Sequence, residues 1–185
     1  MTDFPNWFDV TAKENFEKYV PDTPRLKVLQ IGVFTGDATE WLLSNRNIEY
    51  IVDVDTWQGS VEDAHEEMDF AKVESHYDSR FKGNTKVDKY KMTSTEFLSN
   101  HMYDPEEYDF IYIDGDHTAV QVGIDGLLAW RGLKSGGVIA FDDFTWKSGK
   151  GDFYDPKLGI DSVYHIVKTE VDLLVENSQV WLRKK

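Results

Sequence analysis

Short apolar runs alternate with amphipathic or charged stretches along the whole chain. The runs are rich in Val, Ile, Leu, Phe and Tyr, as is typical of strands buried between two layers of helices. Five strands are predicted in this way, over residues 25–32, 48–54, 86–92, 108–113 and 136–141. Strands that alternate with helices predict an α/β fold with a doubly wound, mostly parallel sheet and right-handed crossovers.

Helices are expected before, between and after these strands. They cover residues 12–19, 38–43, about 60–76, a short segment from 93 and about 160–170. Ser60 with Asp63 has the spacing of a capping box, which places the start of the charged helix there. Thr93 with Glu96 repeats this spacing before the short helix that carries Phe97.

A further helix follows the strand at 108–113. Four apolar residues fall at positions i, i+4, i+7 and i+8 of this helix and form one stripe: Val120, Ile124, Leu127 and Leu128. A continuous stripe of this kind is typical of the face that a helix turns towards a core.

The sequence "VDLLVENSQVWLRKK" (171–185) predicts two strands joined by a tight turn near Asn177–Ser178. This closing hairpin would make the last strand antiparallel and complete a seven-stranded, Rossmann-like sheet. A helical N-terminal segment, residues 1–24, is expected to precede the domain of residues 25–185, because Pro21 and Pro24 end its helix.

Length, charge and composition restrict the class of protein. A chain of 185 residues is long enough for one domain with a buried core. Its net charge of −14 argues against a nucleic-acid partner or an anionic membrane surface, which call for clustered Lys and Arg. The absence of cysteine excludes disulfides and thiolate sites. No signal peptide and no apolar segment of the ~20 residues that span a membrane are recognised, so a soluble, cytoplasmic protein is expected.

The sequence "VLQIGVFTGD" (28–37) predicts a strand, a glycine loop and the start of a helix. Gly32 allows a tight turn, and Gly36 lets the helix begin close to a ligand. A dinucleotide-binding fingerprint would place a third glycine where this chain has Phe34. The loop therefore argues against a phosphate cradle, although a nucleoside could lie over it.

Acidic residues end the second predicted strand. Such an acid, about 20 residues after the glycine loop, commonly binds the hydroxyl groups of a ribose. Asp53 and Asp55 both qualify by position, and Asp55 is preferred because Asp53 still has strand residues on both sides.

Four more carboxylates follow the fourth and fifth strands. Asp114 and Asp116, with His117 directly after them, end the fourth strand, and Asp142 with Asp143 ends the fifth. Carboxylates that converge raise one another's pKa values, and a divalent cation such as Mg²⁺, Mn²⁺ or Ca²⁺ would remove this repulsion. The alternative is that some of them cap helices or face water while the others pair with nearby Lys and Arg side chains.

Taken in order, these motifs resemble the class I S-adenosylmethionine-dependent methyltransferases. The resemblance is to the small group of macrocin-type (macrolide) and aminocoumarin O-methyltransferases, together with sequences called cephalosporin hydroxylases. It covers residues 6–183 and is carried by "LQIGVFTGDATEWLL", "VDTWQGS", "YIDGDHTA", "GGVIAFDDF" and "QVWLRKK". The combination "IDGDH…FDD" is specific, whereas the glycine loop alone is weak.

The resemblance implies a cofactor, a metal and roles for particular residues. S-adenosylmethionine would lie against Gly32, Phe34, Gly36, Asp55, Ser94 and Asp114, with Asp55 at the ribose and Ser94 near the adenine. Asp114, Asp142 and Asp143 would bind the divalent cation, most simply Mg²⁺. Asp116 would be the general base, with His117 as the second choice.

Several questions stay open at this level. The family usually has Glu or Asp where this chain has Gln30, which puts in doubt a charged contact to the cofactor there. Trp57, Phe144 and Trp146 either line an acceptor pocket or pack on the sheet. The leading function is metal-assisted O-methylation of a small hydroxylated molecule, a sugar or natural product. The alternatives are a non-catalytic cofactor-binding or interaction protein and a nicotinamide-dependent oxidoreductase. The acceptor and the oligomeric state, including a homo-oligomer, are left undecided.

Overall fold

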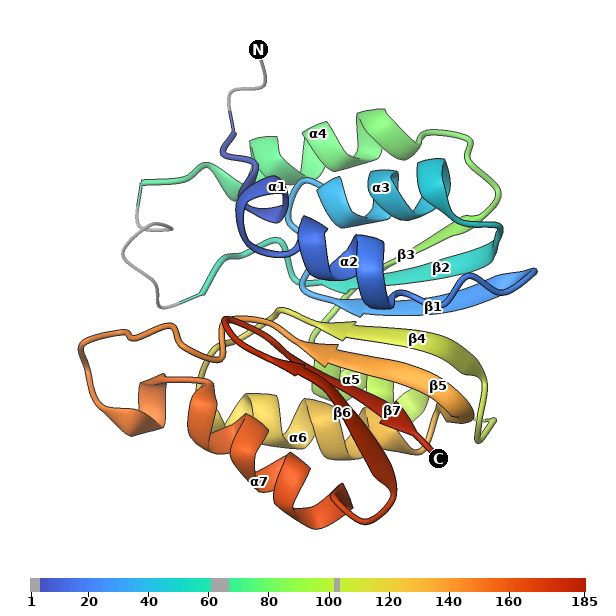
Figure 1. Ribbon diagram of the computed structural model, residues 1–185. Helices are drawn as coiled ribbons and strands as arrows, with labels where there is room; N and C mark the ends of the chain where they lie inside the picture. The colour runs from blue at the N-terminus through green and yellow to red at the C-terminus, as the bar shows by residue number, and fades with distance from the viewer. Residues whose placement is uncertain (1–3, 61–66, 102–103) are drawn as a thin grey trace.

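The computed structural model describes residues 4–60, 67–101 and 104–185, and within them a seven-stranded sheet carries helices on both faces (Figure 1). The strands are β1 (Leu26–Ile31), β2 (Ile48–Asp55), β3 (Val87–Lys91), β4 (Tyr108–Ile113), β5 (Leu133–Phe141), β6 (Val171–Glu176) and β7 (Val180–Lys184). Their order is β3-β2-β1-β4-β5-β7-β6. Strands β1 to β5 pair in parallel, and β7 runs antiparallel to both neighbours. The predicted fold class is therefore confirmed.

The helices are α1 (Trp7–Thr11), α2 (Lys13–Tyr19), α3 (Asp37–Asn45), α4 (Phe70–Phe81), α5 (Ser94–Asn100), α6 (Ala119–Trp130) and α7 (Lys157–Val167), with a short 3₁₀ turn at Asp152–Tyr154. The sequence did not predict α1. The side chain of Thr93 accepts a hydrogen bond from the backbone N–H of Glu96, which confirms the predicted start of α5. None of the described helices has the length and apolar character needed to cross a membrane.

Successive side chains along each strand point to opposite faces of the sheet, so the core is divided between the two faces. Val28 of β1 and Phe110 of β4 point to the face covered by α2 and α3. Leu29 and Ile111, one residue further along, point to the face covered by α5, α6 and α7. Figure 1 shows this division, with α1 to α4 above the sheet and α5 to α7 below it. Both faces are buried, which explains the almost continuous apolar runs of the central strands.

The predicted helix at 60–76 begins later than expected. Residues 67–69 are not helical, and Asp63 lies outside the described residues. The observed helix, α4, starts at Phe70, because the side chain of Asp69 accepts a hydrogen bond from the backbone N–H of Lys72 and caps it there. Its buried residues are Val73 and Tyr77, so packing favours the later segment.

The apolar stripe of α6 faces outward, although such a stripe is typically the face that a helix turns towards the core. Its four residues, Val120, Ile124, Leu127 and Leu128, are 36–53% exposed. The opposite face is buried because its small residues let the helix backbone come close to its neighbours. A Cβ atom on Gly126 would lie 2.8 Å from the Phe141 ring, and one on Gly159 of α7 would lie 2.2 Å from the Ala119 carbonyl.

Candidate functional site

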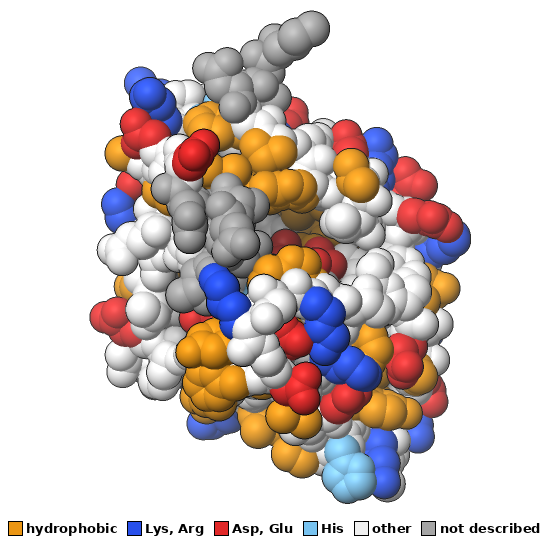
Figure 2. Space-filling model, turned by 90° about the vertical axis from the view of Figure 1, so that its left-hand side faces the viewer, with side chains coloured by type: hydrophobic (Ala, Val, Ile, Leu, Met, Phe, Trp, Pro, Cys, Tyr) orange, Lys and Arg blue, Asp and Glu red, His pale blue; other side chains and the backbone are white. Residues whose placement is uncertain are grey.

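A pocket of about 500 Å³ opens at the carboxyl ends of the parallel strands. Its walls come from the segments that follow β1, β2, β3, β4 and β5, the edge at which doubly wound sheets bind ligands. Figure 2 faces this edge and shows acidic side chains at the bottom of a hollow, with hydrophobic side chains around it.

Nearly all the residues predicted for the site line this pocket. They are Gly32, Phe34, Asp55, Ser94, Asp114, Asp116, His117, Asp142 and Asp143. Gly36 is not among the lining residues; it precedes α3 with φ +82° and lies against the ring of Phe81. Gly36 therefore shapes the start of α3 rather than the wall of the pocket.

The glycine loop is held by Asp55. Both Val33 and Phe34 donate their backbone N–H groups to Asp55 Oδ2, over 2.8 and 3.0 Å, and Trp57 N donates to Oδ1 over 2.7 Å. Phe34 has a φ of +53°, a left-handed conformation that these hydrogen bonds stabilise. Asp55 thus fixes the shape of the loop as well as lining the pocket.

Asp53, the other acid of β2, lies in a buried polar cluster on the face of the sheet that α3 and α4 cover. Its carboxylate accepts hydrogen bonds from Gln30 Nε2 (2.7 Å), Thr39 Oγ1 (2.8 Å) and the Tyr77 hydroxyl (2.7 Å). Gln30 also donates to Thr39, and neither Gln30 nor Asp53 lines the pocket. The residue in the family's usual acidic position therefore joins β1, β2, α3 and α4 instead of facing a ligand.

We expect the stability contributed by Asp53 to depend on pH. Burial raises the pKa of Asp53 from 3.8 to about 6, so protonation favours the folded state. This contribution is fully present below about pH 4 and is lost as the pH rises through about 6. The free energy of unfolding of the wild type, relative to Asp53→Asn, should fall by about 3 kcal/mol from pH 4 to pH 7.

Chemical denaturation of both proteins across this pH range checks the expectation. Asp88→Asn, the same substitution at an exposed position of β3, is the matched control and should leave the pH dependence of the wild type unchanged. Wild-type and Asp53→Asn curves that run parallel would contradict the assignment.

Asp114, His117 and Asp143 form a cluster suited to a cation. One ligand atom from each lies within 4.8 Å of the other two. His117 Nε2 is 3.2 Å from Asp143 Oδ2 and 3.6 Å from Asp114 Oδ1. Burial and the neighbouring Asp142 carboxylate raise the pKa of Asp114 well above its usual range.

Asp142 lies beside this cluster but its oxygens face other groups. The Tyr112 hydroxyl donates a short hydrogen bond to Asp142 Oδ2, and the backbone N–H of Asp143 donates to Oδ1 over 2.8 Å. Asp143 has a φ of +55°, so Asp142 stabilises a strained backbone conformation at the cluster. The sequence predicted the three acids as one metal-binding set; in the structure Asp114 and Asp143 lie together with His117, and Asp142 lies beside them.

Asp116 is placed apart from the cluster, at the start of α6. Its Oδ1 accepts a hydrogen bond of 2.7 Å from the backbone N–H of Thr118, and the residue is exposed within the pocket. Its other oxygen accepts no hydrogen bond among the described residues. The local turn therefore holds Asp116 in position and leaves one oxygen available to take a proton.

Aromatic residues from distant parts of the sequence complete the walls. Trp7 and Phe8 of α1 line the pocket, and the ring of Trp7 lies 4.7 Å from that of Phe34. Trp146 also lines it, with its ring 5.1 Å from that of His117. Trp57 is not in the lining; it is buried against Tyr77 and donates its indole N–H to the Phe34 carbonyl. Sequence periodicity gave no signal for α1 because it has only five residues.

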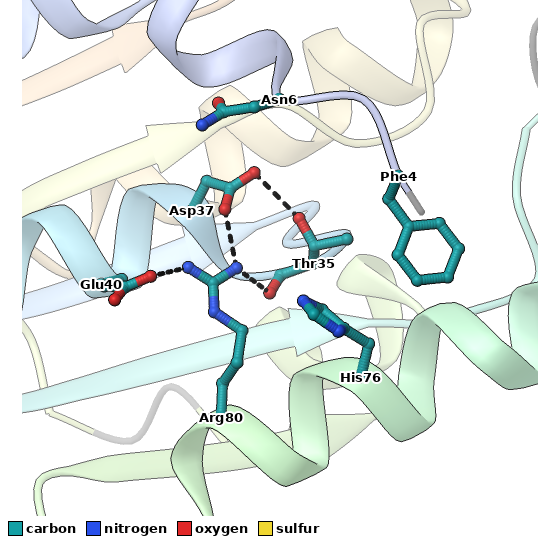
Figure 3. A pocket seen from close by; sticks show the side chains of 7 residues that line it. All are labelled: Phe4, Asn6, Thr35, Asp37, Glu40, His76 and Arg80. Carbon is teal, nitrogen blue, oxygen red and sulfur yellow. Dashed lines mark hydrogen bonds and ion pairs between the residues drawn. The ribbon is translucent and has the colours of Figure 1, made fainter. Parts of the chain in front are cut away.

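A second, smaller pocket of about 360 Å³ lies behind the glycine loop (Figure 3). Its floor is organised by Arg80 of α4, which donates to the Thr35 carbonyl (2.7 Å) and to Asp37 (2.7 Å) and pairs with Glu40. Arg80 therefore ties α4 to both the loop and α3, and two of the residues it contacts, Thr35 and Asp37, also line the main pocket.

A family model described as a methyltransferase domain matches residues 29–144. No curated protein sequence matches the chain. Among solved structures, a protein from Corynebacterium glutamicum is 14% identical with a TM-score of 0.63, over 98% of this chain and 82% of that one.

Two solved methyltransferases have the same fold. The O-methyltransferase from Bacillus cereus in complex with SAH is 20% identical, with a TM-score of 0.57, over 85% of this chain and 74% of that one. MycE methyltransferase from the mycinamycin biosynthetic pathway, in complex with Mg, SAH and mycinamycin VI, is 16% identical, with a TM-score of 0.64. That match covers 99% of this chain, which spans half the length of MycE.

The family model spans more than half of the chain, from the end of β1 to the acids after β5. The strand order and the antiparallel closing strand are those of the predicted class I fold. The chain therefore belongs to the methyltransferase-domain family and is a class I, S-adenosylmethionine-dependent methyltransferase.

Proposed function

We propose that the chain catalyses the metal-assisted methylation of a hydroxyl group on a small molecule, a sugar or natural product. The observation that carries this proposal is the cluster of Asp114, His117 and Asp143 in the same pocket as the glycine loop and Asp55. The molecules bound in two solved structures with this fold support the proposal. MycE is in complex with Mg, SAH and mycinamycin VI, and the B. cereus O-methyltransferase is in complex with SAH.

The residues around the glycine loop fit the cofactor. An ionised carboxylate offers about four acceptor positions, and backbone N–H groups take three of those on Asp55. One position remains for a ribose hydroxyl, while the loop that Asp55 holds would lie against the methionine part, with Gly32 and Phe34 in the wall. Ser94, which lines the pocket after β3, would lie on the adenine side.

The cluster fits a divalent cation. We assign Asp114 and Asp143 as its carboxylate ligands and His117 Nε2 as its nitrogen ligand. Asp142 would support them by holding the backbone of Asp143. Two carboxylates suit Mg²⁺, and the imidazole extends the suitable ions to Mn²⁺. When bound, the cation would lower the pKa of the acceptor hydroxyl and orient it.

The chain itself would position the acceptor and remove its proton. S-adenosylmethionine supplies the electrophilic methyl group, so the protein's part is alignment and deprotonation. Asp116, with one oxygen held by Thr118 N and the other available, is assigned as the general base. His117 was the second choice for this role, but its Nε2 lies between two carboxylates, a position that suits a ligand better.

Binding of Mn²⁺, followed by electron paramagnetic resonance, tests the metal assignment. We expect one site in the wild type and an affinity at least about tenfold weaker in Asp143→Asn, because a direct ligand is lost. Asp152→Asn is the control, since Asp152 is an exposed acid outside the pocket and should bind Mn²⁺ as the wild type does. Equal affinity in all three proteins would overturn the metal site.

A further inference from the structure

Gln121 lies in the first turn of α6, where it lines the pocket together with Met92, Thr93 and Ser94. None of the chemistry proposed above uses it. Its amide is nevertheless held by three neighbours, and the direction in which they hold it determines which group a ligand would meet.

The position of Gln121 along the pocket indicates what it faces, an argument that rests on the proposed function. Asp55, the acid at the end of β2, would bind the ribose. The cation cluster follows β4 and β5, which lie on one side of β2 in the sheet. The base of the nucleoside would then lie on the other side, towards β3, where Met92, Thr93 and Ser94 follow the strand. Gln121 is part of that wall.

The hydrogen bonds of Gln121 fix its amide group. Its Nε2 lies 2.8 Å from Asp125 Oδ1, 2.9 Å from Thr95 Oγ1 and 3.2 Å from Ser94 Oγ. The two hydroxyl groups can donate or accept, so they do not determine which end of the amide faces them. A carboxylate only accepts. Asp125 is fully buried and lies one helical turn after Gln121. Burial raises the pKa of Asp125 to about 6, so above neutral pH its carboxylate is ionised and must face the N–H end of the Gln121 amide.

With the nitrogen directed at Asp125, Gln121 keeps only its Oε1 for a ligand. This oxygen accepts no hydrogen bond from any residue that the structure describes. We propose that Asp125 orients the Gln121 amide so that Oε1 accepts a hydrogen bond from the 6-amino group of the cofactor's adenine. Gln121 is then a specificity-determining residue, and Asp125 is the positioning residue behind it.

This arrangement discriminates by the group at position 6 of the purine. An amino group donates to Oε1, whereas a 6-oxo group would place one acceptor against another and leave Oε1 without a donor. An unpaired buried polar group costs about 1–3 kcal/mol, which corresponds to about 5- to 150-fold in affinity.

Calorimetric titration at about pH 8 with S-adenosylhomocysteine and its 6-oxo analogue, S-inosylhomocysteine, tests the inference. We expect the wild type to bind the adenine compound about 5- to 150-fold more tightly. In Asp125→Asn the new amide accepts or donates, so Gln121 is free to turn, and the ratio of affinities should fall towards one. Gln121→Leu should give the same loss of ratio without altering the buried Asp125, and serves if Asp125→Asn does not fold.

Thr95→Val is the matched control. It also removes an acceptor of a hydrogen bond that Gln121 Nε2 donates, but a hydroxyl does not fix the direction of the amide, so the ratio should be retained. A ratio unchanged in Asp125→Asn or Gln121→Leu, or equal wild-type affinity for the two compounds, would overturn this inference and leave the proposed function standing. Failure of the wild type to bind either compound would overturn the proposed function itself.

Discussion

Replacing Asp116 with Asn should lower the turnover of methyl transfer by about 10²- to 10⁴-fold, the usual contribution of a general base. The amide of Asn can still accept the hydrogen bond from Thr118 N, so the turn at the start of α6 should persist. What is lost is an oxygen that can take the proton of the acceptor hydroxyl. Transfer of labelled methyl groups, measured with an acceptor found by screening the wild type against hydroxylated small molecules, gives the comparison.

The affinity for S-adenosylhomocysteine is the internal control for this variant. It should stay at the wild-type value, because Asp116 is assigned to the acceptor rather than to the cofactor. Full turnover in Asp116→Asn would remove the base assignment. A fall in turnover that is matched by a loss of cofactor affinity would show a role in binding instead.

Gly32→Ala should destabilise the folded protein by about 3 kcal/mol or more, or prevent folding. A Cβ atom at this position would lie 1.8 Å from the backbone carbonyl oxygen of Asp114, and neither backbone can yield without separating the ends of β1 and β4. Overpacking of this kind costs about 1–3 kcal/mol. The left-handed conformation, with φ +80°, adds about 1–2 kcal/mol for a residue with a side chain.

Gly136→Ala separates these two causes. Gly136 has the same φ of +80°, but a Cβ atom there would have no neighbour within 4 Å. Guanidinium denaturation should therefore show a loss of only about 1–2 kcal/mol in Gly136→Ala. Equal losses in the two variants would mean that the contact between the glycine loop and the Asp114 carbonyl does not constrain the fold.

Much of the fold follows from apolar runs and turn residues. The five parallel strands were predicted because strands buried on both faces have almost continuous apolar sequences. The closing hairpin was predicted from the turn at Asn177–Ser178. The face of α6 was not predictable in this way. Its packing depends on Gly123 and Gly159, which let two backbones approach, and on Gly126, which leaves room for the Phe141 ring, whereas periodicity registers only large apolar side chains.

The candidate site was predictable to a similar extent. Because parallel strands end at one edge of the sheet, the positions of Asp55, Asp114 and Asp143 in the sequence indicate that they share a pocket. The partners of each carboxylate depend on tertiary contacts. Asp142 faces Tyr112, which belongs to a neighbouring strand, and no spacing in the sequence reveals that pair.

Binding of S-adenosylmethionine is the property on which the proposed function depends most directly. Calorimetric titration of S-adenosylmethionine into the full chain, with NAD⁺ as the control ligand and with and without Mg²⁺, tests it in one experiment. We predict binding of S-adenosylmethionine in about the micromolar range, no binding of NAD⁺, and a separate heat of Mg²⁺ binding. Binding of NAD⁺ in preference to S-adenosylmethionine, or of neither nucleotide under any of these conditions, would contradict the account.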